Sequence, residues 1–224
     1  MEHETTTYLF HILGLGVTSK VTTMWGVMAL ITIVSFLATK NMGIKPSGIQ
    51  NIMEMTVEGL LNFFGSVMGF ENARRFLPFL GTMFLFILVS NYSGLIPGAG
   101  HVPGLAAPTS TLSVTAGLAI VVFFATHVYG VKQHGASYLK QFLQPLPFLL
   151  PLNLVEHFVR PLSLSLRLYG NIFGEEMIIA TLLALVPYFV PIPMMLLSIL
   201  FGLIQAVVFS VLSSIYFFEA IEHH

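Results

Sequence analysis

The sequence predicts an all-α integral membrane protein with about five transmembrane helices, and its composition and its apolar stretches support that prediction. The chain has 224 residues, of which 55% are hydrophobic and only 8% are charged. Soluble globular proteins carry about 25% charged residues, so this chain has too few charges to cover a surface that faces water. Several apolar stretches reach the roughly 20 residues that an α-helix needs to cross a bilayer. We therefore expect lipid to replace water over much of the exterior.

The composition also excludes several kinds of chemistry. The chain has no cysteine, so disulfides, cysteine-ligated metals and a thiol nucleophile are excluded. The formal net charge of −1 gives no indication of a nucleic-acid partner. Several histidines lack the spacing and surroundings of a metal site and are interpreted as solvated or interfacial; they are His101, His127, His134, His223 and His224. We expect neither a metal nor a cofactor.

Hydropathy divides the chain into segments of one polytopic membrane domain over residues 1–224. The N-terminus carries Glu2 and Glu4 in place of a basic signal-peptide region, so the first hydrophobic stretch should stay as an anchor. Spans are expected over residues 22–39, 76–96 and 111–131, followed by a long helix over 152–186 and a last helix over 194–221. We expect the last two helices to be long and tilted.

Residues 49–70 differ from the spans because polar side chains recur along one helical face. Glu54, Glu58, Asn62 and Ser66 are spaced every fourth residue, and apolar residues fill much of the rest. This pattern is typical of an amphipathic helix at the membrane surface. The alternative is a full span whose polar residues face protein. A second broken or surface-lying segment is expected over residues 141–151, which contain three prolines.

The basic residues predict the orientation. If residues 49–70 do not cross the membrane, only Lys20 falls on one side. The other side then holds Lys40, Lys45, Arg74, Arg75, Lys132, Lys140 and Arg160. Basic residues mark the cytoplasmic side, so we expect five crossings with the N-terminus outside and the C-terminus in the cytoplasm.

Arg167 is the most informative residue because it lies well inside an otherwise apolar helix. A charge at that depth costs at least a few kcal/mol and usually marks a functional site. At 1.5 Å per residue, Glu175 lies about 12 Å and Glu156 about 16 Å away along the axis, too far to pair directly. A carboxylate partner must therefore come from another helix or another chain. The alternative is an ordinary packing stripe, with Arg167 held by carbonyl groups within the protein.

The face around Arg167 and the chemistry of arginine narrow its role. Ser163, Gly170, Asn171 and Gly174 lie near its angular direction, and small residues on one stripe let another helix approach closely. A guanidinium keeps its proton at physiological pH and cannot relay protons. It can lower the pKa of a carboxylate brought beside it and thereby force that group to release a proton.

Residues 163–176, with Arg167, Asn171 and a carboxylate nine residues after the arginine, closely resemble subunit a of F-type ATP synthases. The resemblance covers the chain from about Lys45 to its end. It includes the Asn-Tyr-Ser-Gly-Leu-Ile-Pro run at residues 91–97 and a glutamine, Gln205, in the last helix.

The resemblance implies a stationary, non-catalytic proton-channel subunit with two half-channels. Arg167 would face the essential carboxylate of the rotating c-ring, and Asn171, Glu176 and Gln205 would help line the outer half-channel. The other expected partners are peripheral-stalk subunit b and lipid, the membrane is the bacterial inner membrane, and H⁺ is the expected ion rather than Na⁺.

The sequence departs from the family pattern in two ways. Glu175 and Glu176 form a pair where many members have one carboxylate, and Ser198 stands where some members have a titratable residue. We therefore expect Glu175 or Glu176 to carry proton exchange that Ser198 cannot. Gln205 shares a helical face with Ser198, and both a packing role and a direct transport role for Gln205 remain open.

On the inner side, Glu156 and Arg160 are spaced i, i+4 and can pair. We assign Glu156 and His157 to the cytoplasmic exit, because histidine is the side-chain type whose charge changes near neutral pH.

Two other classes of protein are alternatives. A self-contained secondary transporter often shows internal inverted repeats, but the two halves of this chain show no repeat. A haem-binding redox subunit would need paired histidines on facing helices, and His127 and His157 are the only candidates.

Overall fold

The computed structural model describes residues 8–12, 15–40, 48–96, 99, 105–135, 138, 150–186 and 189–222. The described chain is mostly helical, which confirms the all-α class. The helices are α1 (Ser19–Lys40), α2 (Ile49–Met68), α3 (Phe70–Ser93), the 3₁₀ helix η1 (Pro108–Ser110), α4 (Leu112–His134), α6 (Leu150–Leu185) and α7 (Pro191–Glu222). A short antiparallel hairpin of β1 (Tyr8–Ile12) and β2 (Leu15–Thr18), which the sequence did not predict, precedes α1.

Among the described residues, five helices are long and apolar enough to cross a membrane, namely α1, α3, α4, α6 and α7. The chain is therefore a multi-pass membrane protein. Helix α2 is not among these five; it packs against α3, and its position at the membrane surface stays a prediction. Most of the predicted segment over 141–151 lies outside the described residues, and the single-domain division of the chain stays a prediction.

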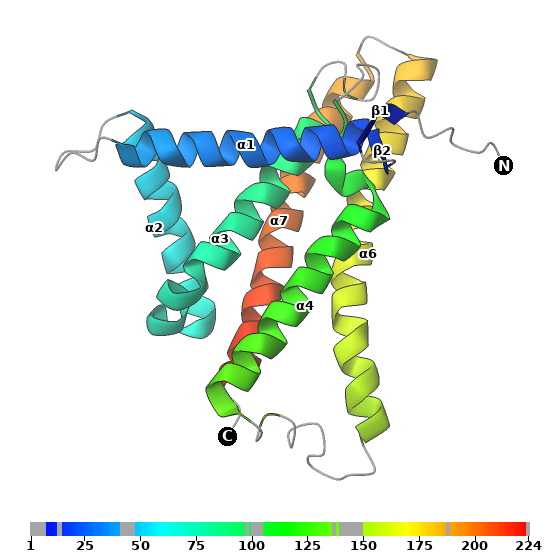
Figure 1. The fold of residues 1–224 in the computed structure, drawn as a ribbon. Coiled ribbons are helices and arrows are strands. Elements are labelled where there is room, and N and C mark those ends of the chain that lie inside the picture. The colour runs from blue at the N-terminus through cyan, green and yellow to red at the C-terminus, as the bar shows by residue number, and fades with distance from the viewer. Residues whose placement is uncertain are drawn as a thin grey trace.

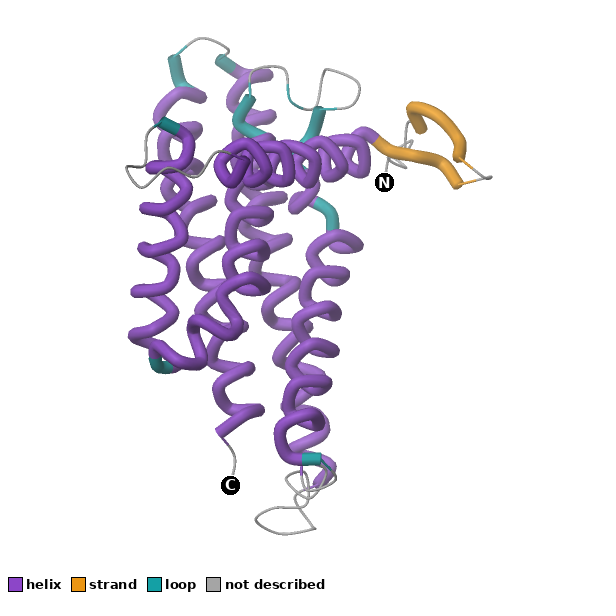
Figure 2. The backbone as a smooth tube through the Cα atoms, turned by 60° about the vertical axis from the view of Figure 1, so that its left-hand side comes forward, coloured by secondary structure: helices purple, strands orange, loops and turns teal. Residues whose placement is uncertain are grey.

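Helices α3, α4, α6 and α7 run side by side as a bundle, whereas α1 lies across one end of it (Figure 1). Figure 2, turned by 60°, shows the same arrangement. Helix α7 is central, because α3, α4 and α6 all pack against it. Residues from different parts of the sequence therefore meet along α7.

Small and aromatic residues alternate along the buried stripe of α7. Gly202, Ala206, Phe209 and Phe217 recur at helical spacing and are buried. The Phe217 ring lies 4.9 Å from that of Phe76 on α3. Small residues let neighbouring helices approach, and buried rings fill the space that remains.

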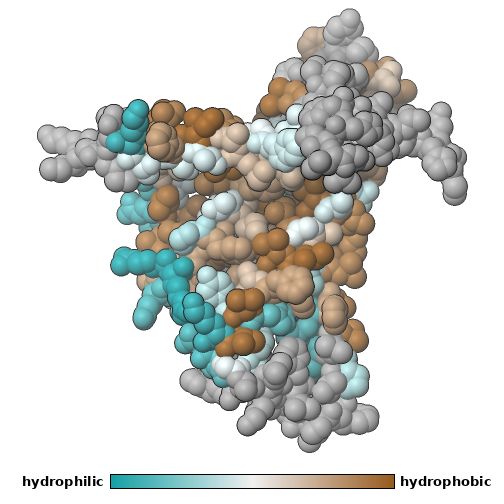
Figure 3. Space-filling view, viewed as in Figure 1, coloured by the Kyte–Doolittle hydropathy of each residue, from teal (hydrophilic) through white to brown (hydrophobic). Residues whose placement is uncertain are grey.

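Apolar side chains cover the centre and right of the face seen in Figure 3, whereas hydrophilic side chains gather at its lower left. Large exposed apolar side chains on α6 and α7 include Leu162, Leu166, Leu197, Leu200 and Ile204. A patch of this extent is a liability in water, but it suits contact with lipid or with an apolar partner helix.

Helices α6 and α7 have 36 and 32 residues. At 1.5 Å per residue, α6 is about 54 Å long, whereas the hydrocarbon core of a bilayer is about 30 Å thick. A helix of this length must tilt strongly or extend beyond the hydrocarbon region. Polar side chains along α6 and α7 can therefore be spread over a distance greater than the thickness of the hydrocarbon core.

Candidate functional site

Arg167 lies near the middle of α6 and its side chain is exposed. Leu164, Leu168 and Ile172 form the buried stripe of the same helix, so α6 packs on its neighbours through a different face. The closest polar contact of Arg167 is from Nη2 to Ser163 Oγ, at 3.5 Å, which is long for a hydrogen bond. Within the described residues no carboxylate forms an ion pair with Arg167.

One turn beyond Arg167, α6 is joined to α7 by an amide pair. Asn171 Nδ2 donates to Gln205 Oε1 at 2.6 Å. Gln205 is buried, with 3% of its surface exposed, whereas Asn171 is exposed. Two residues that the sequence assigned to one half-channel are thus in direct contact, although they lie 34 positions apart.

A second polar network fixes the end of α3 against α7. Asn91 Nδ2 donates to the Gly202 carbonyl at 3.0 Å, and Asn91 Oδ1 accepts from Thr109 Oγ1 at 2.8 Å. A Cβ on Gly202 would lie 3.3 Å from Asn91 Cβ, so glycine permits this close approach. Asn91 begins the run at residues 91–97 that resembles the family, and its amide is polar within an apolar span, but its contact with α7 was not predicted.

The two adjacent carboxylates of α6 point to different neighbours. Glu175 lies close to the Ser198 hydroxyl on α7, and within the described structure Ser198 Oγ is buried without a hydrogen-bond partner. Glu176 Oε1 lies 3.6 Å from the position that a Cβ would take on Gly94, at the end of α3. Glu175 therefore faces α7 and Glu176 faces α3, and both are partly buried.

Toward the start of α6, charged side chains form a paired cluster. Arg160 Nη2 donates to Glu156 Oε1 at 2.7 Å, which confirms the predicted i, i+4 pair. Arg160 Nη1 donates to Glu219 on α7, and the Arg160 guanidinium lies 5.1 Å from the centre of the Tyr216 ring. Glu219 shares a helical face with Gln205, but its pairing with Arg160 was not foreseen.

His157 lies beside this cluster, on the face of α6 that approaches α4. Its Nδ1 is 2.8 Å from the Asn153 carbonyl, and its ring centre is 5.7 Å from that of His127. His127 also packs on Phe123, with ring centres 4.2 Å apart, so it lies between helices rather than in open solvent. In the part of the chain that the structure describes, no group of three or more potential ligands could hold a metal ion.

These features define a multi-pass helical membrane protein whose polar side chains follow α6 and α7 around Arg167, for which the described residues supply no acid. Such an arrangement marks ion pathways in membranes. The chain belongs to the family described as ATP synthase A chain, whose family model matches residues 21–218.

Curated relatives agree with that assignment over nearly the whole chain. An ATP synthase subunit a of Trichlorobacter lovleyi is 43% identical over 219 residues, covering 96% of this chain and 92% of the relative. One of Moorella thermoacetica is 39% identical over 225 residues, with full coverage of both proteins.

Proposed function

We propose that this chain is the stationary proton-channel subunit of a rotary ATP synthase and has no catalytic site of its own. It would conduct protons to and from a ring of c subunits and couple their flow to rotation and ATP synthesis. Its relatives carry the name ATP synthase subunit a. The observation that carries the proposal is the exposed Arg167, which has no ion-pair partner within the described chain.

In this mechanism the carboxylate that Arg167 requires arrives on the rotor. A rotor carboxylate that faces lipid is neutral, because a charge in hydrocarbon is expensive. When it moves beside Arg167, the fixed positive charge lowers the pKa of the carboxylate and favours release of its proton. Because the guanidinium keeps its own proton, it repels free protons and prevents direct passage between the two half-channels.

The outer half-channel is assigned to Asn171, Glu175, Glu176, Ser198 and Gln205. The two carboxylates can take up and release protons, whereas the amides and the hydroxyl can hold water by hydrogen bonds. The contact between Asn171 and Gln205 supports this assignment, because it lies one turn from Arg167. The position of Glu175 near Ser198 extends the polar path along α7.

The inner half-channel is assigned to Glu156 and His157, which lie in the first third of α6. Glu156 is exposed, although Arg160 pairs with one of its oxygens. His157 is partly buried between α6 and α4. A proton leaving the rotor can pass along such groups if water reaches them.

The complex is placed in the plasma membrane of a bacterium, with the N-terminus outside and the C-terminus in the cytoplasm. The segregation of basic residues supports this orientation. The proposed protein partners are the c-ring and peripheral-stalk subunit b, and lipid covers the remaining apolar surface.

The test uses membranes that contain the assembled complex with Arg167→Ala. We expect ATP-driven proton pumping to be lost, while ATP hydrolysis on the soluble side can continue without coupling. Lys132→Ala, which removes an exposed positive charge at the end of α4, serves as the control and should pump normally. Normal pumping by Arg167→Ala would reject the mechanism.

A further inference from the structure

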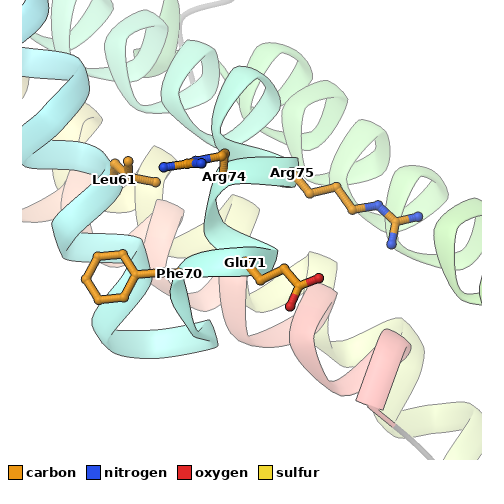
Figure 4. Close-up of a pocket in the computed structure, with 5 residues that line it drawn as sticks. All are labelled: Leu61, Phe70, Glu71, Arg74 and Arg75. Atoms are coloured by element: carbon orange, nitrogen blue, oxygen red, sulfur yellow. The ribbon is translucent and has the colours of Figure 1, made fainter.

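A pocket lies where the last turns of α2 meet the first turns of α3, on the hydrophilic lower left of the view in Figure 3. Figure 4 shows its lining, with Leu61 from α2 and the other residues from α3. The α3 residues are Phe70, Glu71, Arg74 and Arg75. None of these side chains has a role in the proton path proposed above.

The turn between the two helices gives the pocket an apolar wall. Gly69 has φ of 79°, a backbone conformation that glycine adopts without strain, and it lets α3 begin directly after α2. A Cβ on Gly65 would lie 2.8 Å from Phe70 Cδ1, so the Phe70 ring is packed tightly against α2. The ring nevertheless remains 61% exposed.

The two arginines of the pocket differ in their partners. Arg75 points toward α4 (Figure 4), where its Nη1 donates to Gln133 Oε1 at 3.3 Å and its guanidinium lies 5.9 Å from the centre of the Tyr129 ring. Arg74 points toward Leu61, and Glu71 is turned away from it. Arg74 is exposed and, among the described residues, makes neither an ion pair nor a hydrogen bond.

We propose that this pocket binds an anionic phospholipid, with the headgroup phosphate on Arg74 and the start of an acyl chain along Leu61 and Phe70. A guanidinium matches the geometry of a phosphate through paired N–H donors. The site lies at the start of a candidate span and beside the amphipathic α2, and basic residues at the ends of spanning helices favour the headgroup region. The exposed apolar wall favours a lipid over a free phosphate ion.

The experiment uses the whole complex in lipid nanodiscs made of phosphatidylcholine. A small fraction of the lipid is phosphatidylglycerol or phosphatidylcholine with a photoreactive group in its acyl chain, and cross-linked peptides are mapped by mass spectrometry. One basic residue near a membrane surface favours an anionic lipid by about fivefold. We therefore expect the phosphatidylglycerol probe to label the α2–α3 junction about fivefold more than the phosphatidylcholine probe.

Matched variants locate the effect. Arg74→Gln should remove the preference for phosphatidylglycerol, and Arg74→Lys should keep part of it because the charge remains. Lys132→Gln removes an equal charge outside the pocket and should leave the preference unchanged. If Arg74→Gln prevents assembly, the comparison of the two probes on the wild-type complex still decides the matter.

Four results would overturn the proposal. They are equal labelling by both probes in the wild type, an unchanged preference in Arg74→Gln, loss of phosphatidylglycerol labelling when inorganic phosphate is added, and absence of labelling because another subunit covers the junction. The proposed proton channel could still be correct after any of these results, because Arg74 has no part in it.

Discussion

Arg160 and Arg167 lie two helical turns apart on α6, and the surroundings of their charges differ. Arg160 is paired with Glu156 and Glu219 and lies over the Tyr216 ring. Arg167, seven residues further along the same helix, makes only a long contact to the hydroxyl of Ser163. The chain thus neutralises one guanidinium itself and leaves the other without an acid among the described residues.

The difference lies in the residue one turn before each arginine. Glu156 precedes Arg160 by four residues, and Ser163 precedes Arg167 by four residues. The spacing is the same, but the glutamate forms an ion pair at 2.7 Å, whereas the serine makes only a neutral contact at 3.5 Å. A charge that stabilises helix packing needs a permanent ion-pair partner. A charge that acts on a moving carboxylate must instead stay free to pair with that carboxylate.

The strongest way to break this contrast is to give Arg167 a fixed acid. Ser163→Glu reproduces the spacing of Glu156 and Arg160, so the new carboxylate should compete with the rotor for Arg167. Two unit charges 4 Å apart attract by about 4 kcal/mol at an effective dielectric constant of 20, so we expect proton pumping to fall by about a thousandfold. Pumping would be measured in inverted membrane vesicles.

Ser163→Gln is the matched control for this prediction, because it has the same size without the charge. It should retain most of the pumping rate. If Ser163→Gln and Ser163→Glu reduce pumping equally, the size of the side chain is responsible and the contrast between the two arginines has no electrostatic basis.

A smaller effect is expected from the paired carboxylates at the other end of the site. Glu175→Gln and Glu176→Gln should each slow pumping modestly, because the remaining carboxylate can still exchange protons. Together they should slow it by roughly tenfold, since only groups that do not titrate would remain there. Equal initial pumping rates in the wild type and the double variant would remove both residues from the channel.

The smallest effect on transport is expected at Arg160, whose charge serves packing between α6 and α7. Glu219→Gln should lower stability by about 1 kcal/mol or less, because the pair is partly exposed. The temperature at which the subunit leaves the purified complex would measure this loss. Glu219→Asp, which keeps the negative charge, should lose less stability than Glu219→Gln, and a pumping defect as large as that of Ser163→Glu would contradict a packing role.

The positions of the helices and the contacts within each helix could be predicted from the sequence, because they depend on residues that are close together in the chain. Apolar stretches of sufficient length predicted the candidate spans, and i, i+4 spacing predicted the pairing of Glu156 with Arg160. The depth of Arg167 in its helix, and its distance from Glu175 along the axis, also followed from helical geometry alone. The N-terminal hairpin was missed, because its few residues carry no clear strand pattern.

Contacts between helices could not be predicted in the same way. Helical periodicity gives the direction of each side chain around its own axis, but not how one helix is rotated against another. That rotation depends on packing, such as the close approach of Asn91 to Gly202. Packing between helices therefore determines that Glu219 pairs with Arg160 and that Asn171 contacts Gln205. It also determines that α1 lies across the end of the bundle.

The sequence by itself therefore determined the membrane class, the helix positions and the presence of a permanent charge inside α6. Only the tertiary structure decided which side chains on different helices meet, because those partners lie tens of residues apart in the sequence. The physical reason is that local hydrogen bonds and hydropathy form each helix, whereas close packing between helices selects the pairs of side chains that meet.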